Sequence, residues 1–384
     1  MKVLKFLLLI AVILSAIHML VSCGECKHIN SEWRTVTEAT RESEGVKEKF
    51  CDDCHMIVKT DVIPAIGSLG LSYAPNSDVT TCTVTGMGTS SDTEIYIPSY
   101  IDGLKVTAIG EKAFADCKDI TYIKIPNTVE SIGNRAFYGC TGITEITIPE
   151  GVTDIGTQIF YKASNLTTVY YNSSYGSQYN SFLNLSHIIK IVFGGSEVPA
   201  YVCYNNNSVK TVEILDSVTS ISYGAFYYCS SLTSIEIPDS ITSIGYSMFS
   251  GCSSLTSIEI PDSITSIGSS AFFNCSSLTG IEIPDSVTRI GDYAFSNCSS
   301  LTSIEIPDSV TSIGDYTFSN CSSLTSIEIP KSVTSIGKKT FYGCDSLTSI
   351  KYRGTEEEWN AISKGYWWDS STGKYTITYE YTGE

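Results

Sequence analysis

Four cysteine and histidine residues near the N-terminus have the spacing of a metal site. Cys26 and His28 form one close pair, and Cys51 and Cys54 form a second pair about two dozen residues later. Thiolate sulfur and imidazole nitrogen suit a tetrahedral Zn²⁺ ion, and so short a segment has no core of its own. The pattern predicts one structural zinc, with a disulfide between two of the cysteines as the alternative in an oxidising exterior. Four protein ligands would close the coordination shell, so a catalytic metal is not expected.

The same segment resembles a C-x-H-x4-W...C-x2-C module that recurs beside repeat regions in bacterial surface proteins, with Trp33 as the tryptophan. That module often has a further cysteine after an Ala-Thr pair and a glycine after its last cysteine. This chain has Arg41 and His55 at those two places.

A leader precedes this segment. Residues 1–22 combine a positively charged start with an apolar run and small residues, which is typical of a secretory signal peptide. An uncleaved membrane helix is the alternative, but Ser15 and His18 interrupt the run. The four residues from Leu20 to Cys23 resemble the lipobox of bacterial lipoproteins, in which cleavage leaves the cysteine sulfur bearing a diacylglycerol. This resemblance implies that Cys23 begins the mature protein and that its acyl chains anchor the protein to the membrane at the cell surface.

A column of carboxylates is the second chemical feature. Six glutamates share one position in successive repeats: Glu213, Glu236, Glu259, Glu282, Glu305 and Glu328. Carboxylates about 4.8 Å apart repel each other by roughly 1 kcal/mol in water. The column is either an acidic strip for a basic partner or calcium, or a screened charge that keeps an exposed sheet soluble. The second interpretation needs only that the repeats duplicated together.

Tyrosines gather where the repeat loses its register. Tyr170, Tyr171 and Tyr175, with Tyr179 beyond them, lie in an irregular stretch rich in Asn and Ser. Exposed tyrosines in an irregular segment are more typical of recognition than of packing. We therefore expect these four residues at the surface, as a candidate binding site.

The sequence shows no recognisable set of catalytic residues or cofactor-binding motifs. The chain has four histidines; His18 lies in the leader, His28 and His55 lie in the cysteine module, and only His187 falls within the repeats. No paired carboxylates, nucleophile, phosphate loop or dinucleotide fingerprint accompanies His187 in the sequence. We do not expect catalysis.

A period of 23 residues positions the glutamates and the cysteines described next, and the tyrosines lie where this period slips. Phenylalanines mark the copies: Phe114, Phe137, Phe160, Phe226, Phe249, Phe272, Phe295, Phe318 and Phe341. Slipped copies are placed at Phe182 and Cys203, which gives about eleven. One copy has too few apolar residues to close a core, so neighbouring copies must stack. The predicted fold is a repeat solenoid of short parallel β-strands, with a short helical turn where Ala294, Phe295 and Cys298 are spaced i, i+1, i+4.

Most cysteines belong to this repeat. Eight of the 14 share one position: Cys117, Cys140, Cys229, Cys252, Cys275, Cys298, Cys321 and Cys344. Ala163 replaces the cysteine in one copy. We therefore interpret them as small buried side chains and not as a metal or redox ladder.

The chain divides into five parts. Residues 1–22 are the leader, 23–67 the lipidated cysteine and the Cys/His module, 68–110 an N-terminal cap of alternating strands, 111–350 the solenoid and 351–384 a C-terminal cap. The C-terminal cap is expected to contain a short helical turn, a buried Trp359 and a last strand near Ile377.

The repeat resembles a known family. Copies of the form L-x2-I-x-I-P-x2-V-x2-I-G-x2-A-F-x2-C-x2, the entry Gly70-Leu71-Ser72-Tyr73 and the exit from Gly354 to Trp359 are similar to BspA-type leucine-rich repeat surface proteins. The resemblance covers residues 68–384. It implies a leucine-rich-repeat solenoid displayed on a bacterial cell, where known members adhere to host matrix proteins or to other cells.

The net charge of the chain disfavours some classes of binding partner. The formal net charge of −17 makes nucleic acid an unsuitable partner, and anionic lipid headgroups would repel the chain except through its lipid anchor. We expect an extracellular protein or a cell-surface ligand. The alternative is a ligand-capture lipoprotein that passes peptides or glycans to a transporter, which predicts a defined small-molecule pocket instead of a broad contact surface.

Overall fold

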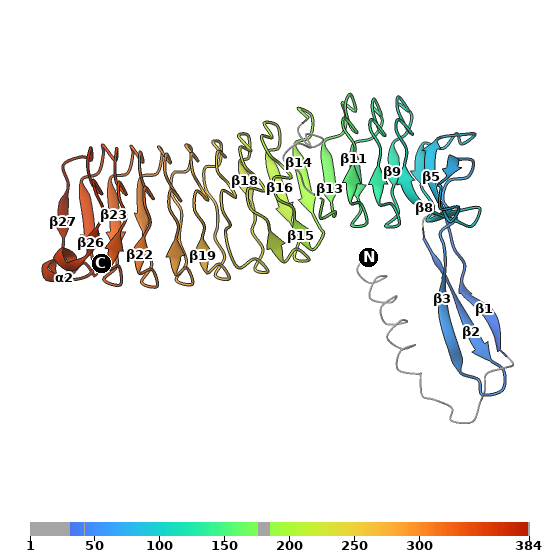
Figure 1. Ribbon diagram of the computed structural model, residues 1–384, viewed down its shortest axis with the longest axis horizontal. Coiled ribbons are helices and arrows are strands. Elements are labelled where there is room, and N and C mark those ends of the chain that lie inside the picture. Colours follow the sequence, from blue (N-terminus) through green and yellow to red (C-terminus); the bar gives the residue numbers. More distant parts are fainter. Residues whose placement is uncertain (1–30, 42, 176–184, 383–384) are drawn as a thin grey trace.

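Two short strands in most coils build a long solenoid (Figure 1). The computed structural model describes residues 31–41, 43–175 and 185–382. Alternation in the Ser-Ile-Glu-Ile and Thr-Ser-Ile segments turns the isoleucines inward and the polar residues outward. Corresponding strands pair in parallel, so that Ile304 lies beside Ile327 and Ile313 beside Ile336. The predicted solenoid is confirmed.

The first strand position of the coils carries the glutamate column, with Glu213, Glu305 and Glu328 on strands of the list that follows. These strands are β6 (Glu94–Tyr96), β9 (Tyr122–Lys124), β11 (Glu145–Ile148), β13 (Thr168–Tyr171), β14 (Lys190–Phe193), β16 (Thr211–Ile214), β18 (Ser234–Ile235), β21 (Ser303–Glu305), β23 (Ser326–Ile329), β25 (Ser349–Tyr352) and β27 (Thr376–Thr378). Proline follows many of them within two residues, as Pro307 follows β21. Proline has no amide hydrogen to donate to a neighbouring strand, so it ends the strand pairing.

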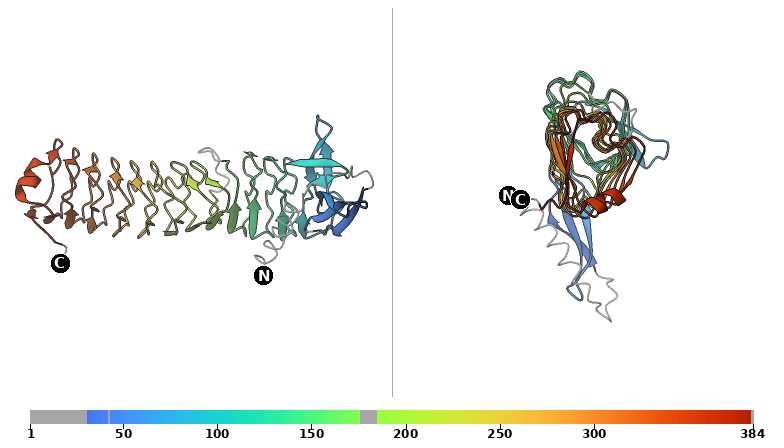
Figure 2. Two further views of the ribbon diagram at one scale, coloured as in Figure 1. Left: turned by 90° about the horizontal axis from the view of Figure 1, so that it is seen from below. Right: turned by 90° about the vertical axis from the view of Figure 1, so that its left-hand side faces the viewer.

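The second strand of each coil lies on another side of the solenoid. These strands are β8 (Leu104–Ile109), β10 (Ser131–Ile132), β12 (Asp154–Ile155), β15 (Glu197–Val198), β17 (Ser220–Ile221), β19 (Ser266–Ile267), β20 (Arg289–Ile290), β22 (Ser312–Ile313), β24 (Ser335–Ile336) and β26 (Ser363–Lys364). Seen from the end, the coils superpose as one closed outline (Figure 2).

The caps are themselves coils. At the N-terminal end, β4 (Ser72–Pro75), β5 (Thr81–Gly86) and β7 (Tyr100–Ile101) join β8, and β5 pairs with β8 in parallel as the coils do. At the C-terminal end, β26 and β27 extend the two strand columns. Helix α2 (Glu356–Ala361) connects β25 to β26, and its Trp359 is buried. The solenoid therefore has about 13 turns, two more than the eleven counted from the repeat.

The corner between the second strand and the next coil is not helical, contrary to our prediction. Tyr293 and Asn297 have φ values of 58° and 61°, the left-handed region. The amides of Tyr293, Phe295 and Asn297 donate to carbonyl groups of the next coil, whereas the amides between them bond back three residues. A helix would direct every amide along its own axis. Left-handed residues at two places per corner direct half of these amides to the neighbouring coil instead.

Buried aromatic rings form the centre of the core. Phe249, Phe272 and Phe295 are fully buried and stack with 5.4 Å between successive centroids. Cys203 takes the place of a phenylalanine, as predicted: its amide donates to the next coil as those of the phenylalanines do, and it is buried. The ring of Phe193 lies 6.0 Å from that of Phe226 at this slip. Phe182, the other predicted slip, falls outside the described residues.

A three-stranded antiparallel sheet projects from the N-terminal end of the solenoid (Figure 1). It contains β1 (Ser31–Thr37), β2 (Gly45–Cys51) and β3 (Ile57–Ile63), in the order β1-β2-β3. Trp33, Val36 and Val62 are exposed, and Cys51 is the one apolar residue fully buried among residues 31–63, residue 42 aside. The sheet therefore has almost no hydrophobic core.

Candidate functional site

Two parallel columns of carboxylates cover one side of the solenoid. Glu236, Glu259, Glu282 and Glu305 are exposed, each between two inward-facing isoleucines, whereas Glu213 and Glu328 are half-buried. Three residues after each of the first five glutamates stands a second exposed carboxylate, a column that the sequence reasoning overlooked: Asp216, Asp239, Asp262, Asp285 and Asp308. Residues 198–330 contain 13 acidic and 2 basic residues. The two columns together form what we call the acidic strip.

Basic side chains close both ends of the acidic strip. Lys190 lies 2.7 Å from Glu213 at one end. At the other end the Arg353 guanidinium contacts Glu305, lies 3.2 Å from Asp308 and 3.8 Å from Glu328. One guanidinium thus spans both carboxylate columns. Burial, followed by the charge of Glu305, raises the pKa of Glu328, and Arg353 opposes this shift.

The predicted tyrosine site is only partly at the surface. Tyr171 is 1% exposed, so our expectation that it lies at the surface is wrong. Strand alternation places it inward on β13, where its ring lies 5.9 Å from that of Phe193 and its hydroxyl donates to the Tyr175 carbonyl oxygen. Tyr170 and Tyr175 are half-buried, and Tyr179 lies outside the described residues.

A larger group of tyrosines lies further along, at the corners of three successive coils. We call it the tyrosine cluster: Tyr201, Tyr204, Tyr223, Tyr227, Tyr228 and Tyr246. The Tyr201 ring is 5.3 Å from that of Tyr223, and the Tyr204 ring is stacked 5.7 Å from that of Tyr227. Tyr223 and Tyr246 are 55% and 57% exposed. Partial burial and the neighbouring phenols raise the pKa values of Tyr201 and Tyr227, so their hydroxyls remain neutral donors.

The corner geometry explains why these rings lie outside. Ala225, Phe226 and Cys229 fill the core, and the positions between them face solvent. Later coils have Ser269 where the cluster has Tyr246, and Ser250 where it has Tyr227. Comparing the solvent-facing corner positions between copies would have revealed the cluster, but our reasoning compared only the core positions and the glutamate position.

The cysteine column is structural. Cys252, Cys275 and Cys298 are fully buried, and burial raises their pKa values well above the usual 9.0. A reactive thiol needs the opposite shift and access to solvent.

The described part of the Cys/His module forms a tight turn. Cys51 ends β2, the amide of His55 donates to its carbonyl oxygen at 2.9 Å, and His55 has φ 56°. His55 thus adopts the conformation for which related modules use glycine. Arg41 joins the module to the first coil, since it donates to Ser68 and lies 2.6 Å from Asp92. Cys23, Cys26 and His28 lie outside the described residues.

The described residues contain neither a metal-binding cluster nor a membrane-spanning helix. No group of three or more His, Cys, Asp or Glu residues in these ranges is arranged to hold a metal ion. No helix in these ranges is long and apolar enough to cross a membrane.

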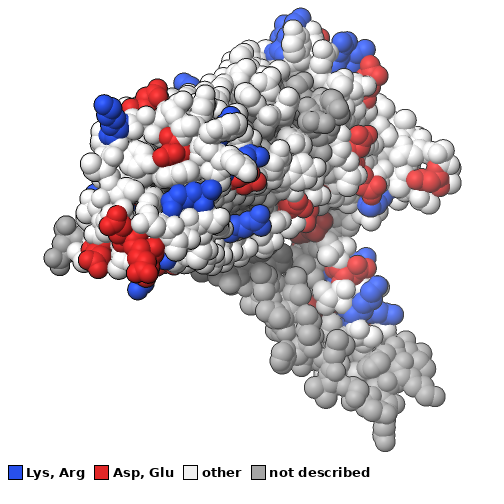
Figure 3. Space-filling view, turned by 60° about the vertical axis from the view of Figure 1, so that its left-hand side comes forward, with Lys and Arg blue, Asp and Glu red and all other residues white. Residues whose placement is uncertain are grey.

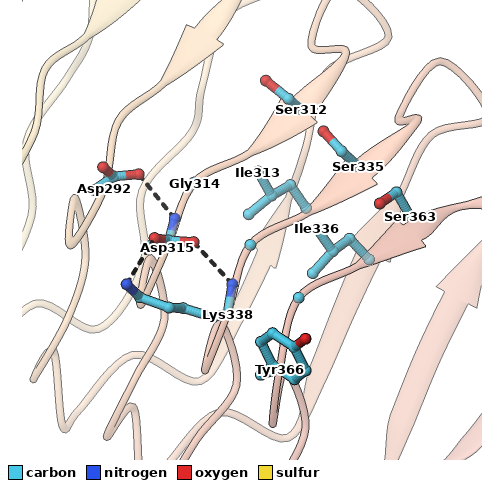
Figure 4. Close-up of a pocket in the computed structure, with 12 residues that line it drawn as sticks. Asp292, Ser312, Ile313, Gly314, Asp315, Ser335, Ile336, Lys338, Ser363 and Tyr366 are labelled. Atoms are coloured by element: carbon cyan, nitrogen blue, oxygen red, sulfur yellow. Dashed lines mark hydrogen bonds and ion pairs between the residues drawn. The ribbon is translucent and has the colours of Figure 1, made fainter.

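The C-terminal corner contains a shallow recess. Two adjoining hollows, of about 430 and 530 Å³, share Lys338 and Tyr366. Ser312 and Ser335 line one side, with Asp292 and Asp315 on the opposite side (Figure 4). Viewed from this end, Lys and Arg side chains form several groups on the surface (Figure 3).

Together these features define a protein of the leucine-rich-repeat class, a stacked solenoid with exposed side-chain columns. The model of the BspA-type leucine-rich repeat region matches residues 107–196, 196–297 and 265–378. The chain belongs to this family, as the repeat predicted.

Solved structures of bacterial leucine-rich repeat proteins are similar over most of the chain. A leucine-rich cell surface protein from Faecalibacterium prausnitzii A2-165 is 29% identical, covering 77% of this chain and 96% of its own, with a TM-score of 0.36. A leucine-rich repeat protein from Bacteroides ovatus ATCC 8483 is 26% identical, covering 80% and 98%, with a TM-score of 0.47. No curated protein matches the chain.

Proposed function

We propose that this chain is a non-catalytic bacterial surface protein that adheres to other proteins, with the tyrosine cluster as the centre of contact. The observation that carries this proposal is that packing does not require tyrosine at two positions of the cluster, those of Tyr227 and Tyr246. Serine occupies equivalent corner positions in the next coils, where the core is equally buried. Repetition does not explain the cluster either, because it is confined to three coils.

The chemistry of the cluster suits a protein partner. Tyrosine offers a large apolar ring with a polar end at low conformational cost, and it is enriched among the residues that dominate interface energies. The rings of Tyr201, Tyr204 and Tyr227 contact one another, which fixes them before a partner arrives. Preorganised side chains lose less entropy on binding.

The acidic strip would favour a partner with basic side chains. Arg353 shows within the molecule how one guanidinium engages both carboxylate columns. In the described ranges, Glu236, Glu259 and Glu282 have no ion pair, so these coils would leave the same arrangement open to a partner. Long-range attraction of this kind raises association rates and weakens with salt.

Binding assays with matched variants test the proposal. Full-length protein would be applied to immobilised matrix proteins, mucins and intact cells. We expect Tyr223→Ser combined with Tyr246→Ser to weaken binding at least about tenfold. Tyr161→Ser is the control, because Tyr161 is an exposed corner tyrosine that pairs with Tyr138 outside the cluster. Equal binding by both variants would exclude the cluster, and no binding to any surface would favour the ligand-capture alternative.

The acidic strip requires its own variant. Replacing Glu236, Glu259 and Glu282 by Gln should slow association about tenfold at low salt and have little effect at high salt. Unchanged association at low salt would show that the strip serves solubility alone.

Display at the cell surface is part of the proposal. The match of Leu20 to Cys23 to a lipobox supports acylation of Cys23, and two or more chains on one residue give stable anchoring. A Cys23→Ala protein should appear in the soluble fraction. Unchanged partitioning into membranes would rule out the lipid anchor.

A structural zinc ion would stabilise the Cys/His module. The sheet has almost no core, so it needs a further link such as a metal. The Cys51–Cys54 turn with left-handed His55 suits two thiolate ligands, and Cys26 and His28 would supply the others. Metal analysis of reduced full-length protein should find one zinc per chain, and Cys51→Ser should lose it. Absence of zinc in the reduced protein would favour the disulfide.

A further inference from the structure

Glycines from three successive coils line the C-terminal recess. Gly314, Gly337 and Gly365 each follow the second strand of a coil and line the first hollow, which we call the furrow (Figure 4). The furrow meets the second hollow at Lys338 and Tyr366, which line both. A ligand longer than one small ring can therefore contact both parts.

Hydroxyl and carboxylate groups line the furrow on opposite sides. Ser312, Ser335 and Ser363 stand in a row on one side. On the other side, Asp292 accepts the Asp315 amide and Asp315 accepts the Lys338 amide, each at 2.8 Å. The backbone of the next coil thus holds each carboxylate in position. Lys338 lies 3.4 Å from Asp315, which offsets its charge.

An exposed aromatic pair adjoins the charged side. Tyr366 is 85% exposed and Trp367 is 66% exposed. Packing does not require Trp367, because the next residue, Trp368, turns inward and contacts the buried Phe341 ring. Trp367 also has φ 56°, a left-handed conformation that is unfavourable for a large side chain. Ser247 and Ser270 occupy the equivalent position in other coils.

A lysine supports the tryptophan ring. The Lys339 ammonium nitrogen lies 5.3 Å from the Trp367 ring centroid and 5.0 Å from that of Tyr342. Such contacts restrict the ring without covering its other face. A large apolar ring held at the surface beside fixed polar groups is typical of a binding site.

We propose that the C-terminal recess binds an oligosaccharide, with a pyranose ring packed on Trp367 or Tyr366 and its neighbours along the furrow. The C–H groups on one face of a pyranose carry partial positive charge and pack against the negative face of an aromatic ring. The ring hydroxyls both donate and accept, which matches carboxylates, serine hydroxyls and a lysine placed side by side. Both hollows are open to solvent, which leaves room for a chain of several sugar rings. This inference does not depend on the proposed adhesion through the tyrosine cluster.

Titration with defined saccharides tests the inference. Maltohexaose, cellohexaose, N-acetylchitohexaose and hyaluronan hexasaccharide would be added to full-length protein, with calorimetry and tryptophan fluorescence as readouts. We expect at least one to bind with a dissociation constant of about 1 mM or tighter and to change the emission of Trp367. Trp367→Ser should weaken that binding at least about tenfold. Failure of all four probes would overturn the inference.

A second variant separates this site from the tyrosine cluster. Tyr246→Ser removes the corner tyrosine equivalent to Tyr366 but lies several coils away. It should leave saccharide binding unchanged while it weakens protein adhesion, and Trp367→Ser should do the reverse. Equal saccharide binding by wild type and Trp367→Ser would contradict the inference. A concentration-dependent dimer in sedimentation that Trp367→Ser abolishes would also overturn it, because the aromatic pair would then serve self-association.

Discussion

The Cys298 thiol donates to the Phe272 carbonyl oxygen, 3.2 Å away in the preceding coil. The same contact recurs along the solenoid: Cys140 with Phe114, Cys252 with Phe226, Cys275 with Phe249, Cys321 with Phe295 and Cys344 with Phe318. A small side chain with a weak donor fits this buried place, which explains why the repeat uses cysteine there.

Truncating one of these thiols should have a measurable cost. Cys298→Ala removes a buried sulfur and leaves the Phe272 carbonyl oxygen without its thiol donor, so we expect a loss of about 1 kcal/mol in the free energy of unfolding. Cys117→Ala is the control, because Cys117 is half-buried and its sulfur lies 3.8 Å from Ala115 in its own coil. Urea denaturation followed by circular dichroism would measure both. Equal losses would contradict the role of the contact between coils.

Glycines in the furrow should not tolerate a side chain. A Cβ atom on Gly337 would lie 2.5 Å from the Asp315 backbone nitrogen in the preceding coil. The coils cannot separate without breaking their hydrogen bonds, so Gly337→Ala should destabilise the protein by at least about 2 kcal/mol. Gly280→Ser is the matched control, since nothing lies within 4 Å of its Cβ position and other copies have serine there. A melting temperature unchanged by Gly337→Ala would disprove this reasoning.

Left-handed corner positions should distinguish glycine from alanine. Asn297 has φ 61°, and Gly251 and Gly343 occupy the equivalent position with φ 79° and 75°. Asparagine tolerates this conformation and glycine prefers it, whereas alanine loses about 1 kcal/mol in it. We therefore expect Asn297→Ala to lower the free energy of unfolding by about 1 kcal/mol and Asn297→Gly to leave it nearly unchanged. The reverse order in denaturant titrations would be inconsistent with the left-handed corner.

Arg353 should stabilise the last coils. Replacing it with Met leaves Glu305, Asp308 and Glu328 without their shared cation, and the Glu328 side chain is 15% exposed. We expect a loss of about 1–2 kcal/mol at neutral pH, less than for a fully buried pair. Lys105→Met, which breaks the exposed pair with Glu130, should change stability by less than about 0.5 kcal/mol.

The pH dependence of the Arg353 variant is a second readout. The pKa of Glu328 is already raised above 4.5 by burial and by Glu305, and loss of Arg353 raises it further. A raised carboxyl pKa means that the folded protein holds the proton more tightly than the unfolded chain, so its contribution is present at low pH and is lost as pH rises through the folded pKa. The deficit of Arg353→Met should therefore shrink as pH falls towards 4.5. A deficit independent of pH would show that Glu328 is not involved.

Periodicity predicted the fold because it reports burial directly. Phe295, Cys298 and Ile304 recur at fixed spacing and each is buried, so the stack followed from the sequence. The prediction of a helical turn at the corner was wrong, because turns with left-handed residues also place Ala294, Phe295 and Cys298 inward. Hydrogen bonds to the next coil favour these turns over a helix, and the sequence of a single copy does not reveal such bonds. The burial of Trp359 in the C-terminal cap was predicted correctly, because the sequence around it departs from the repeat.

The candidate sites were harder to predict. Tyr171 was expected outside because its segment is irregular, yet its strand pairs in register with β14 and turns it inward. Tyr246 lies within a regular copy, where attention to the core positions hides it, and Trp367 lies in the C-terminal cap, beyond the last regular copy. The pairing of Arg353 with Glu305 joins residues two coils apart, which no local pattern indicates.

The buried thiols predict an alkaline limit to stability. Burial raises the pKa values of Cys140 and Cys344 to about 12, from 9.0, and those of the fully buried thiols between them are also well raised. A thiol in the unfolded chain loses its proton near pH 9, whereas the folded protein keeps it, so the stabilisation is complete below pH 9 and declines between about pH 9 and 12. Because the column contains many such thiols, the free energy of unfolding should fall steeply as the pH rises through this window. Replacing Cys275 and Cys298 by Ala should make the decline shallower while lowering stability at pH 7. Thermal unfolding at a series of pH values would measure both effects, and parallel declines in wild type and variant would exclude the thiols as the cause.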